Sequence, residues 1–91
     1  MNQRAGIIVT GIVQGVYFRY NTRKKAYDFG LKGWVRNLSD GTVEIVCEGE
    51  KERIEQFVTW CRRGPEGAHV EQVDVDWKDP TGEFDDFRIL Y

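Results

Sequence analysis

The spacing of apolar residues changes several times along this 91-residue chain, and the order of those changes limits the possible folds more than any other feature. The clearest segment is 54–61, where four apolar residues recur at helical spacing before Gly64-Pro65 ends the pattern. A helix is also expected over 21–29, with Gly30 as its C-terminal cap. Alternating or β-branched apolar residues predict strands at 6–13, 32–38, 42–48, 73–77 and 87–91.

The resulting order is strand, helix, strand, strand, helix, strand, followed by one short strand. This is the split β-α-β, ferredoxin-like α+β arrangement, in which two helices pack on one face of an antiparallel sheet. Because the chain has no internal linker or repeat, we expect a single domain over residues 1–91. Many unrelated functions use this fold, so the chemistry has to be inferred from individual residues.

Charge is distributed unevenly along the chain, although the formal net charge is only −2. Residues 1–36 contain seven Lys or Arg and one acidic residue, whereas residues 37–91 contain six basic and fourteen acidic residues. This asymmetry favours an anion site in the first third of the chain. Solvated surface charge that happens to be uneven is the alternative explanation.

The connection between the first strand and the first helix has the features of an anion-binding loop. It consists of Gln14, Gly15, Val16, Tyr17, Phe18 and Arg19. Backbone N–H groups at such a position can converge on an anion, and Gly15 permits a backbone conformation that other residues resist. Arg19, just before the expected helix, offers a planar fork of donors that matches two phosphoryl oxygens. Taken in isolation, Arg19 also fits a surface role, and we expect Lys24 and Lys25 to point into water.

The same region resembles a known family. Residues 11–19, Gly-Ile-Val-Gln-Gly-Val-Tyr-Phe-Arg, resemble the first signature of the acylphosphatase family, and residues 33–44, Gly-Trp-Val-Arg-Asn-Leu-Ser-Asp-Gly-Thr-Val-Glu, resemble its second. Residues 22, 30–31, 64–65 and 86–89 also match the usual pattern of that family. The likeness extends from about Ala5 to Tyr91, and two long signatures in the right order are far more specific than a lone glycine motif.

The resemblance implies an enzyme that hydrolyses the carboxyl–phosphate bond of small acyl phosphates. In that family the arginine ending the first signature binds the phosphate, and here it is Arg19; the amides of residues 14–19 complete the cradle. The asparagine of the second signature positions the attacking water, and here it is Asn37. Its place before a Ser-Asp-Gly turn is equally typical of a turn residue. The position of Tyr17 varies among members of that family, and the large tyrosine side chain here is expected to narrow the mouth of the pocket.

These residue types suit the proposed reaction. The leaving group is a carboxylate, a weak base with a pKa of about 4–5, so it departs without a general acid. The phosphoryl transition state is loose, and catalysis depends mainly on charge stabilisation and placement. Arg19 and backbone donors supply the charge stabilisation. The Asn37 carbonyl can accept a hydrogen bond from water and so place the nucleophile. No metal and no cofactor are expected.

The other chemically distinctive residues are expected to be structural. His69, the only histidine, lies at the start of the fourth strand and is expected at the surface. Cys47 and Cys61 lack metal-ligand spacing and fall on apolar faces, which predicts buried free thiols. We interpret Glu48 and the other glutamates of residues 48–55 as helix-capping and solubilising residues, and the aspartates of 74–86 as a solvated rim.

Two alternatives share part of this pattern. RNA-recognition modules have the same order of elements but need aromatic residues on the third strand, whereas residues 42–48 contain none and include two acids. The second alternative is a regulatory or carrier role, because acylphosphatase-like modules also begin larger maturation proteins that process carbamoyl phosphate. Those proteins continue with cysteine-rich zinc segments, so a free-standing enzyme is the simpler expectation.

The expected partners are therefore a small acyl phosphate and inorganic phosphate or a similar anion, with no nucleic acid and no membrane. The chain has no run of about 18 apolar residues and no apolar signal segment at its start. We expect a monomer in the cytoplasm with reduced thiols. Acetyl phosphate, carbamoyl phosphate and 1,3-bisphosphoglycerate all fit the chemistry as substrates.

Overall fold

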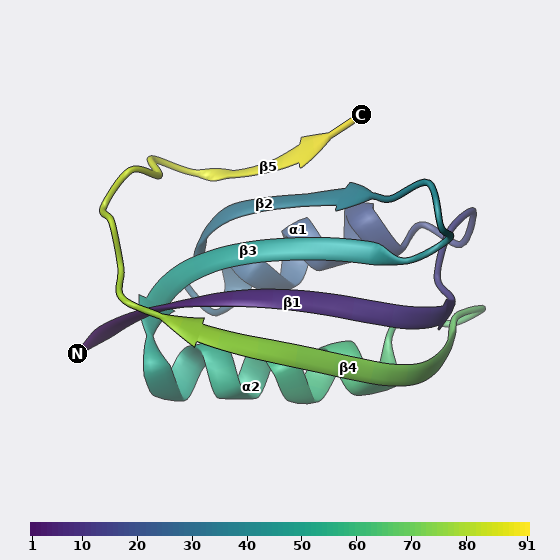
Figure 1. Cartoon of the computed structure of the whole chain (residues 1–91), viewed down its shortest axis with the longest axis horizontal. Coiled ribbons are helices and arrows are strands. Elements are labelled where there is room, and N and C mark those ends of the chain that lie inside the picture. Colours follow the sequence, from purple (N-terminus) through teal and green to yellow (C-terminus); the bar gives the residue numbers. More distant parts are fainter.

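The computed structural model describes all residues from 1 to 91, in seven elements that follow the expected order (Figure 1). The strands are β1 (Asn2–Ile12), β2 (Lys32–Asn37), β3 (Val43–Glu50), β4 (His69–Lys78) and β5 (Phe87–Leu90). The helices are α1 (Phe18–Asp28) and α2 (Lys51–Arg63). All five strands form one sheet in the order β4-β1-β3-β2-β5. This topology confirms the ferredoxin-like α+β fold.

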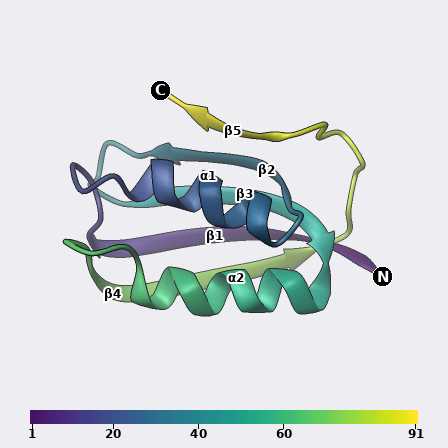
Figure 2. The ribbon, with the colours of Figure 1, turned by 180° about the vertical axis from the view of Figure 1, so that it is seen from behind.

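Both helices lie on the same face of the sheet, as predicted (Figure 2). α1 contacts β2 and β5, and α2 contacts β4, β3 and β1. Strands β1 to β4 pair in antiparallel fashion, whereas β5 pairs parallel to β2 and makes the sheet mixed. The chain between β4 and β5, residues 79–86, passes around one end of the sheet from one edge to the other (Figure 1). β5 therefore begins at the end where β4 finishes and runs in the direction of β2.

The core fills the space between the sheet and the helices. Strands β1 and β3 contribute cross-strand pairs of fully buried residues: Ala5 with Cys47, Ile7 with Ile45, and Val9 with Val43. Helix α2 adds the four apolar residues whose spacing predicted it, and all four are buried. Burying a large aliphatic or aromatic side chain contributes about 1.5–3 kcal/mol. The alternation in β1 and β3 and the apolar stripe of α2 thus account for the two layers.

Helix α1 begins three residues earlier than predicted, at Phe18 instead of Asn21. Tyr17 precedes it in a left-handed conformation, with φ 59° and ψ 27°. Phe18 is buried, and its ring lies 5.7 Å from that of Trp60 on α2, measured between centroids. This packing fixes the start of the helix. Arg19 therefore lies in the first turn of α1 and not before it, beside N–H groups that any helix leaves unpaired.

One buried carboxylate fixes the segment that leads into β5. Glu48 is only 8% exposed and accepts hydrogen bonds from the N–H groups of Thr81 (2.9 Å) and Gly82 (3.0 Å), from the Thr81 hydroxyl (3.0 Å) and from Arg4 (2.9 Å). Arg4 also donates to Glu83 at 2.6 Å. Burial raises the pKa of Glu48, but the hydrogen bonds outweigh burial and hold its pKa below the usual range. The interpretation of Glu48 as a capping or solubilising residue is therefore wrong. We refer to these five residues as the Glu48 cluster.

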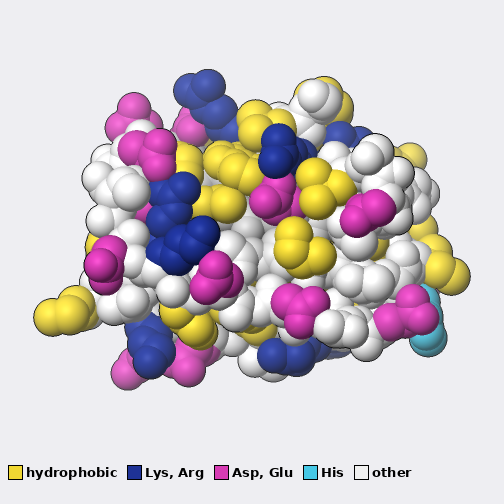
Figure 3. Space-filling view, in the orientation of Figure 1, with side chains coloured by type: hydrophobic (Ala, Val, Ile, Leu, Met, Phe, Trp, Pro, Cys, Tyr) yellow, Lys and Arg dark blue, Asp and Glu magenta, His cyan; other side chains and the backbone are white.

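The face of the sheet that points away from the helices is open to solvent (Figure 3). Hydrophobic, basic and acidic side chains are interspersed on it, without one continuous basic patch. Arg36 of β2 lies 2.6 Å from Glu44 of β3, and its guanidinium lies 5.0 Å from the ring centroid of Trp34. Positive charge that is already paired gives little attraction for a phosphate backbone.

Candidate active site

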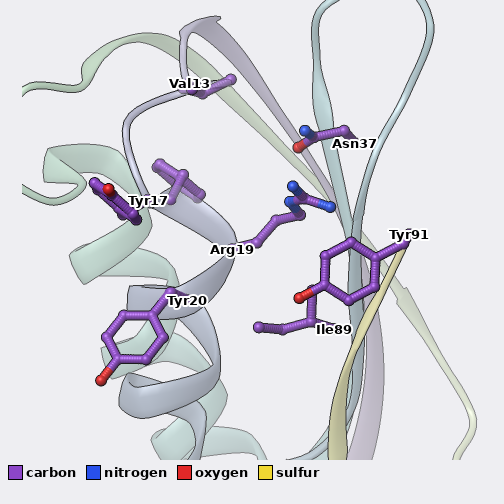
Figure 4. A pocket seen from close by; sticks show the side chains of 9 residues that line it. Val13, Tyr17, Arg19, Tyr20, Asn37, Ile89 and Tyr91 are labelled. Atoms are coloured by element: carbon purple, nitrogen blue, oxygen red, sulfur yellow. The ribbon is translucent and has the colours of Figure 1, made fainter.

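A cavity of about 490 Å³ opens at the end of the sheet where β1, β2 and β5 finish and α1 begins (Figure 4). The predicted residues Gly15, Tyr17, Phe18 and Arg19 line it from the loop and the start of α1. Asn37, the last residue of β2, lines it from the sheet. The Arg19 side chain extends from α1 into the space below Asn37 in Figure 4. Both residues with predicted catalytic roles are thus brought to one cavity.

The loop backbone presents a row of unpaired donors. Gly15 (φ 75°) and Tyr17 (φ 59°) are left-handed on either side of Val16, an alternation typical of backbone nests that bind anions. The N–H groups of residues 15–20 donate to no backbone or side-chain acceptor. The last three belong to the first turn of α1, which contains no acidic residue. Six consecutive donors at the positive end of a helix dipole favour an anion here.

Arg19 has the only charged side chain among the residues that line the cavity. Its Nη1 atom donates to the carbonyl oxygen of Leu90 at 3.4 Å, and its guanidinium carbon lies 4.9 Å from the ring centroid of Tyr91. It forms no ion pair with any carboxylate of the chain. The contacts with β5 and Tyr91 orient the side chain, and most of its five donors stay free for a ligand.

Asn37 offers an acceptor that lacks a donor. Its Oδ1 atom is buried and has no hydrogen-bond partner, a condition that costs about 1–3 kcal/mol of stability. The backbone of Asn37 pairs with Val43 of β3, so the residue sits at the rigid end of a strand. An oxygen held in this way on the cavity wall can accept a hydrogen bond from a water or a ligand.

Two of the six predicted substrate-binding residues, Gln14 and Val16, do not line the cavity. The Gln14 side chain donates to the carbonyl oxygens of Leu38 and Thr42 at 2.8 and 2.9 Å. These hydrogen bonds tie the loop to the turn between β2 and β3, next to Asn37. Gln14 therefore fixes the position of the loop relative to Asn37, while Val16 lies against a separate hollow beside Trp60 of α2.

Sequence reasoning did not identify four of the residues that line the cavity: Val13, Tyr20, Ile89 and Tyr91. The alternation of Phe87, Ile89 and Tyr91 indicated that these three side chains share one face of a strand. It could not show that this face meets the start of α1, because that depends on the path of residues 79–86 around the sheet.

The other residues considered from the sequence lie outside the cavity or at its rim. Tyr17 is 81% exposed, and its ring turns away from Arg19 (Figure 4). His69 is exposed and lies at the start of β4. Cys47 and Cys61 are buried and free, as predicted, and burial raises the pKa of both thiols, that of Cys47 to about 12.

Two further features concern the whole chain. No group of three or more His, Cys, Asp or Glu side chains is arranged to hold a metal ion. Neither helix is long and apolar enough to cross a membrane. Of the two buried side-chain oxygens without a hydrogen-bond partner, Asn37 Oδ1 belongs to a residue of the cavity lining, and Thr22 Oγ1 belongs to α1 outside it.

The fold and the cavity together define a ferredoxin-like α+β protein with a candidate site for a small anion. The family model for acylphosphatase matches residues 5–89, and the chain belongs to the acylphosphatase family. Members of this family are hydrolases that act on acyl phosphates.

Individual relatives agree with this assignment. An acylphosphatase from Pelotomaculum thermopropionicum is 52% identical over 88 residues, which cover 97% of this chain and 96% of the relative. The crystal structure of acylphosphatase from Bacillus subtilis is similar with a TM-score of 0.94 at 36% identity, and the match covers 100% of both chains. Full-length HypF matches all of this chain over 12% of its own length, with a TM-score of 0.87 and 30% identity.

Proposed function

We propose that the cavity hydrolyses small acyl phosphates to a carboxylate and inorganic phosphate. In this proposal the amides of the loop from Gln14 to Arg19 and the Arg19 guanidinium bind the phosphoryl group, and Asn37 orients the attacking water. The observation that carries the proposal is the set of six consecutive unpaired N–H groups beside an arginine that forms no ion pair. A dianionic phosphoryl group would satisfy both.

The lining of the cavity constrains how the reaction proceeds. The water oxygen forms a bond to phosphorus, and the bond from phosphorus to the bridging oxygen breaks, so the carboxylate leaves with the electron pair. No Asp, Glu or His side chain lines the cavity to act as a base. The proton of the water therefore passes to a phosphoryl oxygen or to solvent. A loose transition state tolerates a weakly activated nucleophile, provided that the water is well placed.

Each polar group then has a defined task. The N–H groups and Arg19 stabilise the charge on the phosphoryl oxygens, and they do so without reorganisation because loop and helix already hold them. Asn37 Oδ1 accepts a hydrogen bond from the water and so directs an oxygen lone pair toward phosphorus. A lysine could not accept this bond, and an aspartate would repel the phosphoryl group. The proposed chemistry requires no metal, and chelation with EDTA should leave it intact.

The remaining parts of the proposal concern the form in which the enzyme acts. All of the groups assigned a role come from one chain and one hydrophobic core, which supports a monomer formed by a single domain over residues 1–91. Two buried free thiols suit a reducing compartment, which supports a cytoplasmic location. The paired charges on the open sheet face support the absence of a nucleic-acid partner.

The decisive experiment compares Arg19→Ala with Arg23→Ala. Arg23 is a matched control: it lies one turn further along α1, donates to the Phe87 carbonyl oxygen of β5 at 3.2 Å and lies 5.3 Å from the Tyr27 ring, but it does not line the cavity. Arg19→Ala should lower kcat/KM for benzoyl phosphate by about a hundredfold or more. Arg23→Ala should stay within about threefold of the parent protein.

Denaturation with urea should show that both variants remain folded. Equal activity of the Arg19 and Arg23 variants would exclude Arg19 as the phosphoryl ligand and would end the proposal.

A further inference from the structure

The side chain of Gln14 connects the loop between β1 and α1 to the hairpin that carries Asn37. Its Nε2 atom donates to the carbonyl oxygen of Leu38 at 2.8 Å and to that of Thr42 at 2.9 Å. Leu38 follows Asn37 directly along the chain. Thr42 precedes Val43, the residue of β3 that pairs with Asn37. One side-chain amide thus uses both of its hydrogens on the two sides of the hairpin, at the level of Asn37.

These hydrogen bonds are the only ones that join the loop, residues 13–17, to the turn between β2 and β3, residues 38–42. A different pair holds the loop to its own helix, where the Tyr17 carbonyl oxygen accepts from the N–H and from the side chain of Asn21. The Gln14 side chain is half-buried and does not line the cavity. It therefore links two parts of the cavity wall from outside the cavity.

We propose that Gln14 is a positioning residue of the reaction. Its side chain holds the loop, which binds the phosphoryl group, at the distance from Asn37 that places the attacking water on phosphorus. This inference rests on the proposed function, because it takes from that function the roles of the loop amides and of Asn37. It adds a role for the Gln14 side chain in the chemical step, distinct from the role of its backbone amide in the phosphate cradle.

Asn37 depends on such a connection because the oxygen assigned to the water is not held by the chain. Its Oδ1 atom has no hydrogen-bond partner, so its position follows from the backbone at the end of β2. A displacement of about 1 Å at a reacting group can lower a rate by about a hundredfold. A loop that moves relative to the hairpin would therefore slow the chemical step even when every polar group of the cavity is present.

The hairpin does not need Gln14 in order to close. The Leu38 carbonyl oxygen also accepts from the Gly41 N–H at 3.2 Å, and the Thr42 carbonyl oxygen also accepts from the Leu38 N–H at 2.9 Å. Each carbonyl oxygen keeps a backbone donor when the Gln14 amide is removed. Loss of the Gln14 side chain should therefore leave the hairpin folded and release only its position relative to the loop.

The test uses Gln14→Met, which keeps the length of the side chain, adds no charge and cannot donate a hydrogen bond. The kcat for benzoyl phosphate should fall by about tenfold to a hundredfold, because the water is no longer well placed. The inhibition constant of inorganic phosphate should stay within about threefold of the parent value, since it depends on the loop amides and Arg19 and not on the water. A residue needed only for folding would not lower kcat while phosphate binding is retained.

A double-mutant cycle tests whether Gln14 acts through Asn37. In the Asn37→Ala background, Gln14→Met should lower kcat by less than about threefold, because no carboxamide remains to be placed. A residue that acts on the phosphoryl group independently of Asn37 would lower kcat by the same factor in both backgrounds.

Asn21→Ala is the matched control. The Asn21 side chain is also an amide that donates to the loop, to the Tyr17 carbonyl oxygen at 2.9 Å, but it ties the loop to α1 and not to the hairpin. Its replacement should leave kcat and the inhibition constant of phosphate within about threefold of the parent values.

The outcomes separate this inference from the function on which it rests. An unchanged kcat in Gln14→Met, an equal loss in both backgrounds, or a loss of phosphate binding that matches the loss of activity would each overturn the positioning role and leave the hydrolase proposal standing. If Asn37→Ala has no measurable activity, the comparison of kcat with phosphate inhibition in Gln14→Met decides alone. Failure of the parent protein to hydrolyse benzoyl phosphate would instead overturn the proposed function itself.

Discussion

The two ends of the sheet contain the same kinds of polar group, but these groups are hydrogen-bonded at one end and unpaired at the other. At the Glu48 cluster, a buried carboxylate receives four hydrogen bonds from Arg4, Thr81 and Gly82. At the opposite end, the N–H groups of residues 15–20 and the Oδ1 atom of Asn37 have no partner within the chain. Both ends contain backbone amides, an arginine and a side-chain oxygen. They differ in how many of these groups have a hydrogen-bond partner within the chain.

This difference separates stability from function in a small protein. Satisfied buried polar groups add stability, whereas unsatisfied groups lower it and persist where a ligand completes them. The Glu48 cluster holds the segment before β5 against one end of the sheet. At the cavity end, the N–H donors of residues 15–20 and the Asn37 Oδ1 acceptor remain unpaired. Substitutions at the first end should therefore change the free energy of unfolding, and substitutions at the second should change activity.

The largest expected effect is on the activity of Asn37→Ala. The variant should lose about a hundredfold to a thousandfold in kcat/KM for benzoyl phosphate, because water is no longer directed at phosphorus. Its free energy of unfolding in urea should stay the same or rise by up to about 1 kcal/mol, since an unpaired buried oxygen is removed.

The control for Asn37 is Asn21→Ala. Asn21 donates from Nδ2 to the Tyr17 carbonyl oxygen at 2.9 Å, next to the loop, but does not line the cavity. It should retain activity within about threefold. If Asn37→Ala were fully active but less stable by 2 kcal/mol or more, on the scale of about 1–3 kcal/mol for a buried hydrogen bond, the contrast between the two ends would be broken.

The next effect concerns the stability of Glu48→Ala. Removing the carboxylate leaves the Thr81 and Gly82 N–H groups without their acceptor and takes away one of the two carboxylates that pair with Arg4, so the free energy of unfolding should fall by about 2–3 kcal/mol. Activity per folded molecule should stay within about threefold, because β5 still pairs with β2 and keeps Phe87 in the core. Urea unfolding tests the change in stability. Measurement of kcat/KM at temperatures well below the unfolding transition tests the retained activity.

Glu44→Ala is the control on the same strand. Its partner Arg36 is 47% exposed, so this surface ion pair should contribute less than about 1 kcal/mol. Equal stability losses for the two glutamate variants would show that the Glu48 cluster has no special role.

A third prediction concerns the binding of an anion at the cavity end of the sheet. Inorganic phosphate at ten times its dissociation constant should stabilise the protein by about 1.4 kcal/mol, which raises Tm by about 6–10 °C. The same shift should appear in Glu48→Ala, from a lower starting Tm, because its cavity is intact. It should disappear in Arg19→Ala and persist in Arg23→Ala. A full shift in Arg19→Ala would place the anion elsewhere.

The order of elements follows from local patterns, and for that reason it could be predicted. The stripe of α2 and the alternation of β3 are set by residues close in sequence, and both appear in the structure. The start of α1 was misplaced because it depends on a long-range contact, the packing of Phe18 against Trp60. The parallel pairing of β5 is likewise decided by the path of residues 79–86, which carries no periodic signal.

The candidate site shows the same division. Family resemblance located Arg19 and Asn37, and the structure brings them to one cavity. Neither spacing nor resemblance revealed Ile89 and Tyr91 as lining residues, because β5 reaches the cavity only through the path of residues 79–86. Glu48 was misread for a related reason: its alternation points it away from the core, and only the returning segment buries it.

The smallest effect is the pH dependence of stability at the Glu48 cluster. The pKa of Glu48 is below its usual range despite burial, and hydrogen bonds from Arg4 and Thr81 lower the pKa of Glu83 as well. A carboxyl whose pKa is lower in the folded state contributes stability that is complete above its unfolded pKa, about 4.3, and is lost as the pH falls through the folded value. The free energy of unfolding should therefore decline below about pH 5. The difference between the parent protein and Glu48→Gln, which carries no titrating group at this position, should shrink over the same range. A difference that stays constant from pH 6 to 3, a range that spans the reference value of about 4.3, would mean that Glu48 acts through its shape and not through its charge.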